Sequence, residues 1–591
     1  MTTGKALNGK PYAGNPHVRF DEGEVASAAM PRRGSLLYKL LKTSKIKGGR
    51  SLAAFLPLCK ASILAAGIVA APIAASAGNA SIISNGSFES YTGFTPGSGA
   101  HGDLNSSRKL TSWTWGGNKV TIVSSGDSPF LNGEEAPDGA IVMSLQGVTW
   151  LSQTITVPTT GVYEVTFLHR KRKGYADSTI HGVLDGKEFG YAKAVQTNVF
   201  STAHMKVYAT AGTHTLVISN GVSSAHPVID KVEMSLMTAN LVSNPSFEDY
   251  VYSSSFSDYK TIGATDFPEA WPWSGDLRFA KGTSFATAGV PDGEMAIALR
   301  ASASISQNII APTTGVYEVT FKYGNRSATG NGNTKAFAFI DDEPLGSVTM
   351  WTNAIQTAHF YTDLAAGQSY TLTITNNATS TGTDTDFLID LVSVAFTTNI
   401  IKNGGFDGGS IGNKVLSTVG NRYLQANQSA YSNPFWESTG STGNTGLSQS
   451  GAAWVSAALD VGTYALYIQT KSNTGDVSVK QDFSVANPGV YSLSFRHACR
   501  NSSRTPYPET RVRIYSGSGT SGSVVFERKV TSSVADSWTD YSANVKIPDV
   551  GAYTLEFYRA GRTTADVAAV LDDVCLAWQG KIRKGFTLIV R

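Results

Sequence analysis

The sequence is poor in cysteine and in charged residues. Only 3 of the 591 residues are Cys, which excludes a disulfide-rich scaffold and any zinc module built on cysteine. Asp, Glu, Lys and Arg make up 16% of the chain, well below the average of about a quarter, and no heptad or collagen-like period appears. This composition excludes a highly charged disordered chain and argues against a nucleic-acid-binding protein, which normally carries a basic face.

The small net charge hides an uneven distribution. The whole chain carries +3, but residues 1–77 carry +8, residues 581–591 carry +4 and residues 78–580 carry −9. An acidic body between two basic ends favours cations over nucleic acid or acidic glycans as general partners, because like charges repel.

The two ends do not read as parts of the fold. Residues 1–42 are interpreted as a disordered extension, and residues 43–77 join a basic stretch to an apolar segment that ends Ala75-Ser76-Ala77. This arrangement is typical of a secretory signal, and it predicts a secreted or cell-surface protein. The alternative is an anchor that stays in the membrane. Residues 581–591 form a basic tail that resembles a prepilin processing site, with Val590 in place of its glutamate.

Three blocks of sequence recur in the same order. The first block begins at Asn85, Asn244 and Asn403, with a spacing of 159 residues each time. The second block begins at Gly161, Gly315 and Gly489, and the third block contains Asp230, Asp390 and Asp572. This self-similarity predicts three repeats, at residues 79–237, 238–397 and 398–580.

The repeats show the period of β-strands. Tyr163, Val165 and Phe167 alternate with polar residues, as a half-buried strand requires. Asp185-Gly186 between two alternating runs predicts a tight hairpin, and no segment after residue 78 has a convincing helical period. Many short strands with Gly, Asn and Ser turns predict an all-β chain of three tandem jelly-roll β-sandwiches.

The recurring blocks resemble galactose-binding-like β-sandwiches. This class includes carbohydrate-binding modules of bacterial glycanases and plant cell-wall domains of the same shape. The resemblance covers residues 79–580 and rests on N-G-x-F-E, S-Q-x-I, G-x-Y-x-V-x-F and I-D-x-V. It implies an exported, non-catalytic protein that binds polysaccharide or glycoprotein glycans. The alternative is a structural cell-envelope, matrix or adhesion protein without a sugar site.

Each repeat contains one acidic residue near its start and another in its last strand. The pairs are Glu89 and Asp230, Glu248 and Asp390, and Asp407 and Asp572. In the resembled fold the first and last strands are neighbours, and many members hold a structural calcium, so the resemblance implies that these acids are calcium ligands. Calcium needs six to eight oxygens. The alternative is that the carboxylates accept hydrogen bonds from turn amides.

Two polar residues recur at fixed offsets from the second block. Gln153, Gln307 and Gln481 read as structural, whereas Arg172, Arg326 and Arg500 are candidates for either structural ion pairs or sugar binding, because a guanidinium offers a fork of donors. The basic run from His169 to Lys173 occurs in the first repeat alone, and a solvated loop is favoured over a patch for acidic polysaccharide.

Aromatic doublets follow the first block in each repeat. They are Trp113 and Trp115, Trp271 and Trp273, and Phe435 and Trp436. We expect one ring of each doublet to lie in the core and the other to lie outside, so that Trp115, Trp273 and Trp436 are the candidate sugar platforms.

The sequence offers little for catalysis. No G-x-S-x-G, H-E-x-x-H or phosphate-binding loop is present, and no distinctive pair of carboxylates stands out beyond the recurring ones. Cys499 and Cys575 are the two cysteines beyond the signal region. Their positions within the strands argue that they point apart unless a bulge intervenes, so a disulfide between them is left open.

Overall fold

The computed structural model describes residues 80–582 except for 98–99, 252–255, 264–266, 269, 282–288, 326–334, 350–354, 377–385, 410–422, 429–430, 441–443, 450–463, 471–474, 501–506, 536 and 562–566. The predicted extension, the predicted signal and most of the basic tail lie outside the described residues. Residues 78–591 form one compact unit.

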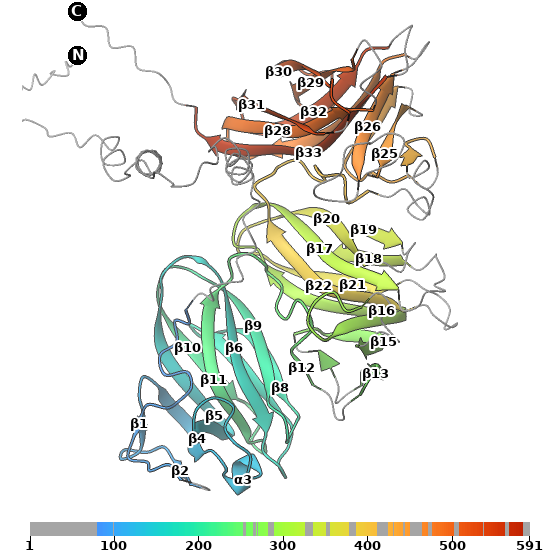
Figure 1. The fold of residues 1–591 in the computed structure, drawn as a ribbon. Helices are drawn as coiled ribbons and strands as arrows, with labels where there is room; N and C mark the ends of the chain where they lie inside the picture. Colours follow the sequence, from blue (N-terminus) through green and yellow to red (C-terminus); the bar gives the residue numbers. More distant parts are fainter. Residues whose placement is uncertain are drawn as a thin grey trace, which may run out of the picture. The chain divides into compact units, whose positions relative to one another are not determined.

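The described elements are almost all strands, in three successive groups that Figure 1 colours from blue to red. The first group comprises β1 (Tyr91–Thr92), β2 (His101–Asp103), β3 (Lys109–Leu110), β4 (Thr114–Ser124), α3 (Ser128–Leu131), β5 (Ile141–Val157), β6 (Gly161–Lys171), β7 (Ser178–Leu184), β8 (Lys187–Ala194), β9 (Ser201–Ala209), β10 (Gly212–Asn220) and β11 (Pro227–Leu236). The second comprises β12 (Tyr250–Val251), β13 (Tyr259–Thr261), β14 (Phe267–Pro268), β15 (Trp273–Ala280), β16 (Ala296–Ile310), β17 (Gly315–Asn325), β18 (Lys335–Ile340), β19 (Glu343–Thr349), β20 (Gln356–Leu364), β21 (Ser369–Asn376) and β22 (Phe387–Phe396). The third comprises β23 (Tyr423–Gln425), β24 (Glu437–Gly440), β25 (Thr445–Ser448), β26 (Ala465–Thr470), β27 (Val477–Val485), β28 (Gly489–Cys499), β29 (Glu509–Ser516), β30 (Val524–Thr531), β31 (Thr539–Ile547), β32 (Gly551–Arg559) and β33 (Val567–Gly580).

Repeats 1 and 2 share one topology. Their main strand orders are β8-β7-β10-β5-β11-β6-β9 and β19-β18-β21-β16-β22-β17-β20. The long strand β5 pairs with β11 near its start and with β10 over its second half, so it passes from one layer of the sandwich to the other. The backbone turns at Gly147 (φ 68°), and Ala301 (φ 51°) occupies the same position in β16.

Repeat 3 builds the same layers from separate strands. The counterpart of β5 is divided into β26, in a six-stranded sheet, and β27, in a five-stranded sheet. The chain is therefore all-β and built from β-sandwiches, as the sequence predicts.

Each large hydrophobic core draws on a single repeat. The three main clusters contain Phe88 to Met234, Leu241 to Val394 and Ile401 to Leu576. Tyr163, Val165 and Phe167 are at most 1% exposed in β6, so the alternation read from the sequence places their side chains inside. A repeat that buries its own apolar side chains has its own source of stability.

Several local expectations are also tested. Asp185 (φ 50°) and Gly186 (φ 81°) form the predicted hairpin turn between β7 and β8. The four-residue helix α3, which Asp127 caps, was not predicted. Cys499 pairs with Ala569 and Cys575 with Ser494 across β28 and β33, so the two cysteines lie apart and are not joined by a disulfide. Within the described residues no helix is long and apolar enough to cross a membrane.

Candidate functional site

The three recurring asparagines hold the loop at the start of each repeat. The Asn85 side-chain amide donates to the Ser90 carbonyl (2.9 Å), and its oxygen accepts from the Ser90 N–H (2.9 Å). The residue after each asparagine is bound to a bulge in the last strand. In repeat 1, for example, the carbonyl oxygen of Gly86 accepts a hydrogen bond from the N–H of Val232 (2.9 Å). The first and third sequence blocks are therefore two halves of one structural junction.

The recurring glutamines brace the same loop. Gln153 accepts from the Ser84 N–H (2.8 Å) and donates to the Ser84 carbonyl (2.7 Å). Gln307 does the same with Ser243, and Gln481 with Lys402. The structural interpretation of the glutamines is confirmed, because each side chain pairs with both the N–H and the carbonyl of one loop residue, as a neighbouring strand would.

The acidic pairs do meet, and both members bind backbone amides of one loop. Glu89 accepts from Ala140 (2.7 Å) and Ile141 (2.8 Å), and Asp230 accepts from Asp138 (3.0 Å) and Lys231 (2.7 Å). Burial raises the pKa of Asp230 to about 8, and the nearby carboxylates of Asp138 and Glu89 add to the rise.

The other repeats hold equivalent acids. Glu248 and Asp390 bind the loop at 292–295 in the same way, and burial raises the pKa of Asp390 to about 7. In repeat 3, Asp407 accepts from the Tyr464 N–H (3.2 Å), and burial raises the pKa of Asp572.

Calcium at these acids stays a prediction. No group of three or more His, Cys, Asp and Glu side chains is placed to hold a metal within the part of the chain that the structure describes. Calcium needs six to eight oxygens, so two carboxylates would depend on main-chain carbonyls and water for the remainder. The hydrogen bonds to turn amides, which were the alternative, are present.

One tryptophan in each repeat belongs to the core. The indole N–H of Trp113, Trp271 and Trp436 donates to the carbonyl of Asn85 (3.0 Å), Asn244 (2.9 Å) and Asn403 (2.9 Å), respectively. Trp436 is 5% exposed, so the prediction of a sugar platform at Trp436 is wrong. In repeat 3 the second ring of the doublet turns inward and Phe435, at 39% exposed, lies outside.

The other two predicted platforms are half-buried. Trp115 pairs with Leu151 and Trp273 pairs with Ile305, both inward-facing residues, and each indole packs against its core. In repeats 1 and 2 the second ring of each doublet is therefore less buried than the first, but neither indole is fully exposed on the surface.

Two of the predicted arginines are described. Arg172 donates from Nε to the Pro129 carbonyl (2.8 Å), and its guanidinium lies 3.7 Å from the centre of the Phe130 ring. Arg500 is half-buried, and its backbone N–H donates to Ala568 (3.1 Å). Arg326 lies outside the described residues. The contacts of Arg172 favour a structural role over a ligand contact.

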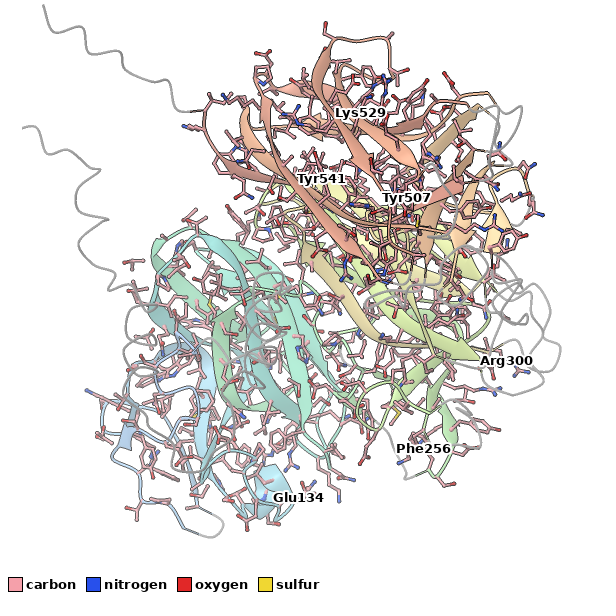
Figure 2. The ribbon with its side chains drawn as sticks, turned by 45° about the horizontal axis from the view of Figure 1, so that its top comes forward. Glu134, Phe256, Arg300, Tyr507, Lys529 and Tyr541 are labelled. Atoms are coloured by element: carbon pink, nitrogen blue, oxygen red, sulfur yellow. The ribbon has the colours of Figure 1, made fainter. Side chains whose placement is uncertain are left out.

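The basic run of repeat 1 is not a solvated loop at its start, contrary to expectation. His169 and Arg170 lie near the end of strand β6 and are at most 1% exposed. Arg170 pairs with Glu134, which Figure 2 labels beside α3. Burial lowers the pKa of His169 to about 4, and neither ring nitrogen has a hydrogen-bond partner.

The outer sheet face of repeat 1 carries the exposed aromatics that the motifs did not reveal. A cross-strand row runs through Gly116, Trp150, Ser219, His181 and Tyr191 on β4, β5, β10, β7 and β8. Trp150 is 38% exposed and Tyr191 57% exposed. Adjacent strands are ~4.8 Å apart, so the two rings are separated by about 14 Å along the row.

Gly116 explains how Trp150 lies on this face. A Cβ at Gly116 would be 2.5 Å from Cζ2 of Trp150, so the indole rests on the bare backbone of the neighbouring strand. Hydroxyl residues surround it, because Ser152 and Ser219 share the face. A flat ring with hydroxyl neighbours matches a sugar, which presents C–H groups inside a rim of hydroxyls.

The corresponding row of repeat 2 is also free of charge. It runs through Ser274, Ser304, Thr375, Phe337 and Ser347. Phe337 is half-buried and stacks with Phe339, with ring centres 6.3 Å apart. Repeat 2 thus keeps hydroxyls and aromatics on this face but offers no exposed tryptophan there.

Repeat 3 replaces this surface with a ladder of alternating charge. Counted from the glutamines, the row that corresponds to Trp150 runs through Thr439, Ser478, Tyr558, Arg511 and Lys529. The charged row next to it on the same face runs through Glu437, Lys480, Glu556, Arg513 and Glu527. Lys480 lies 3.4 Å from Glu437, and Arg513 lies 3.3 Å from Glu527 and 3.7 Å from Glu556. Lys529, labelled in Figure 2, extends the charges along the edge strand β30.

Among solved structures, the chain is similar to several carbohydrate-binding modules. One is TmCBM61 in complex with β-1,4-galactotriose, with 16% identity, TM-score 0.22, 31% of this chain and 99% of that chain covered. Another is the CBM22-1–CBM22-2 tandem of Paenibacillus barcinonensis Xyn10C, with 14% identity, TM-score 0.20, 55% and 99% covered. A third is the enzymatically active domain of bacteriophage CBA120 tailspike protein 4, with 11% identity, TM-score 0.20, 30% and 21% covered.

Protein families provide the firmer assignment. No curated protein matches the chain. The family described as "Protein of unknown function (DUF642)" matches residues 81–235 and again residues 240–395, which together exceed half of the chain. The chain therefore belongs to the DUF642 family.

Proposed function

We propose that the chain is a secreted or cell-surface protein that binds polysaccharide or glycoprotein glycans without catalysis. The observation that carries the proposal is the outer face of repeat 1, where Trp150 and Tyr191 stand exposed among hydroxyl side chains. The two rings lie on one strand row about 14 Å apart, a spacing that suits a chain of sugars rather than a single small molecule.

The chemistry of this face favours neutral sugars. The row from Gly116 to Tyr191 contains no carboxylate or ammonium, and Glu188 beside it is paired with His181 (3.1 Å). The recurring carboxylates, which are the acids most regularly placed in the chain, accept N–H bonds from turns. The proposal that the protein does not cleave its ligand is consistent with that use of the acids.

Binding of the full chain to neutral polysaccharides tests the proposal. We expect Trp150→Ala to lower the affinity about tenfold or more, equivalent to at least about 1.4 kcal/mol. Trp578→Ala is the matched control, because Trp578 is 45% exposed in repeat 3 and should leave the affinity unchanged. Equal loss in both variants, or no retention on any polysaccharide, would favour the structural alternative. Release of soluble sugars would contradict the absence of catalysis.

We further propose calcium as a structural ion at the acidic pairs. The observation behind it is that Glu89 and Asp230 bind amides of the same loop. Burial is the main cause of the raised pKa of Asp230, and the neighbouring carboxylates of Asp138 and Glu89, which a cation would stabilise, add to it. Extracellular sites bind calcium at roughly 10⁻⁴–10⁻³ M, and a concentration ten times the Kd adds about 1.4 kcal/mol of stability. A melting temperature that responds to calcium in the parent and responds less in Asp230→Asn supports the site of repeat 1. A melting temperature unchanged by calcium and by chelator argues against it.

A further inference from the structure

A groove lies where repeats 1 and 2 adjoin within the compact unit. Its volume is about 740 Å³, and residues of β8 and β9 line it together with residues near the start of β15 and the end of β16. Tyr191 and Trp273 contribute aromatic rings, and Lys193, His204 and Lys206 contribute basic side chains. The described residues that line the groove include no Asp or Glu.

Two acids lie behind one of the basic groups. His204 contacts Glu164 through Nδ1 (3.0 Å) and Asp249 through Nε2 (3.1 Å). These hydrogen bonds outweigh burial and raise the pKa of His204 to about 9, so it is charged at neutral pH. His204 is therefore more than balanced by its two acidic partners, and the charge of Glu164 also acts on Lys206. Lys193 adds a further positive charge to the lining of the groove.

Lys206 is held by neutral acceptors. Its ammonium donates to the Asn308 carbonyl (3.1 Å) and to the side-chain oxygen of Gln307. Burial lowers its pKa to about 7, although the charge of Glu164 acts in the opposite direction. An anion placed in the groove would stabilise the ammonium form, since it would supply the counter-charge that the acceptors lack.

The junction between repeats 2 and 3 fills the equivalent space. Phe435 stands where repeat 2 has Ala270, one residue before the core tryptophan, and both have a positive φ (72° and 67°). Lys402 stands where repeat 2 has Ser243, one residue before the recurring asparagine.

These larger side chains pack together. The Phe435 ring centre is 6.0 Å from the ring centre of Tyr361, and the Lys402 ammonium lies 5.4 Å from the Phe435 ring centre. Tyr361 occupies the strand position in repeat 2 that Lys206 occupies in repeat 1. Lys402 also pairs with Asp363 (2.6 Å). The groove at the first junction thus exists because Ala270 and Ser243 are small and Lys206 is not aromatic.

We propose that this groove binds a sugar unit that carries an anionic group, with that group at Lys206 and the sugar ring against Trp273. The proposal rests on the proposed glycan-binding function and adds a second site, which takes acidic sugars, to the neutral face of repeat 1. Carboxylate and sulfate groups share the required charge, so the experiment separates them.

The test measures binding of the full chain to polygalacturonate, dextran sulfate and uncharged dextran. We expect binding to at least one of the two anionic polymers and at least tenfold weaker binding to dextran. Ala270→Phe copies the side chain that the second junction already accommodates, so it should plug the groove and lower anionic affinity at least tenfold. Phe435→Ala is the matched control and should change that affinity less than twofold.

Lys206→Met provides an independent variant, because it keeps the stem of the side chain and removes the charge. It should lower anionic affinity at least tenfold while Trp578→Ala leaves it unchanged. Anionic affinity that survives Ala270→Phe in a folded protein, or that survives Lys206→Met, overturns the groove proposal. Loss of neutral binding in Trp150→Ala is judged separately, so the two proposals can fail independently.

Discussion

The outer faces of repeats 1 and 3 differ more than their backbones do. Both faces are formed by equivalent strands, counted from the glutamines Gln153 and Gln481. Repeat 1 presents Trp150 over bare backbone, whereas repeat 3 has Ser478 at the equivalent position and Lys480 between two glutamates in the adjacent row. Side chains that recur in every repeat therefore build the fold, and side chains that differ between repeats distinguish their surfaces.

The largest effect should come from a recurring tryptophan. Trp436→Ala should lower the free energy of unfolding of repeat 3 by about 3–5 kcal/mol, because it leaves a cavity and an unpaired Asn403 carbonyl. Trp150→Ala, at the exposed position in repeat 1, should cost less than about 1 kcal/mol. Thermal unfolding of the two variants measures the difference. Similar stability losses would mean that the distinction between fold and surface residues is false.

An intermediate effect is expected from a buried histidine. His169 lacks hydrogen-bond partners in repeat 1, whereas the equivalent His497 contacts Ser532 (3.1 Å) in repeat 3. Because the pKa of His169 falls from 6.5 to about 4 on folding, the unfolded chain gains the proton first as the pH falls. Stability should therefore decline between about pH 6.5 and pH 4, by on the order of 3 kcal/mol.

The matching substitution is His169→Tyr, which copies Tyr323 at the same position in repeat 2. We expect this variant to lose stability less steeply over that pH range. Denaturant unfolding at several pH values measures the slope, and equal slopes in the parent and the variant would show that another group causes the acid sensitivity.

The smallest effect is expected from the charge ladder. Lys480→Met should change the free energy of unfolding by less than about 1 kcal/mol, because its partner Glu437 is largely exposed and the pair is screened by water. The change should shrink further at high salt. A loss of several kcal/mol, measured by denaturant unfolding, would show that the ladder stabilises repeat 3 as a network rather than as separate pairs.

Much of the fold could be predicted because its signals are local. Alternation in Tyr163, Val165 and Phe167 identifies a strand, and Asp185-Gly186 identifies a hairpin, from a few consecutive residues. The glutamines were also interpreted correctly, since the same side chain at the same offset in three repeats is expected of a structural role.

The candidate site was harder to predict because it depends on neighbours across the sheet. Trp150 belongs to no recognisable motif. The one available signal was its even spacing from Ser152 and Thr154, which places all three residues on the same, polar face of β5. Trp436 was misassigned because the sequence does not show which ring of a doublet turns inward. Gly116 and Trp150 are 34 residues apart and meet only through strand register.

The sequence alone determined that this protein is a tandem of β-sandwiches, because hydrophobic periodicity and internal repetition act through short-range patterns. The tertiary structure decided which aromatics are exposed, which acids bind turn amides and where a groove remains open. Those properties depend on side chains from distant strands, whose volumes and charges meet only after the sheets have formed. At the next junction Phe435 stands in the position of Ala270, and this one larger side chain packs into the space that is a groove at the first junction.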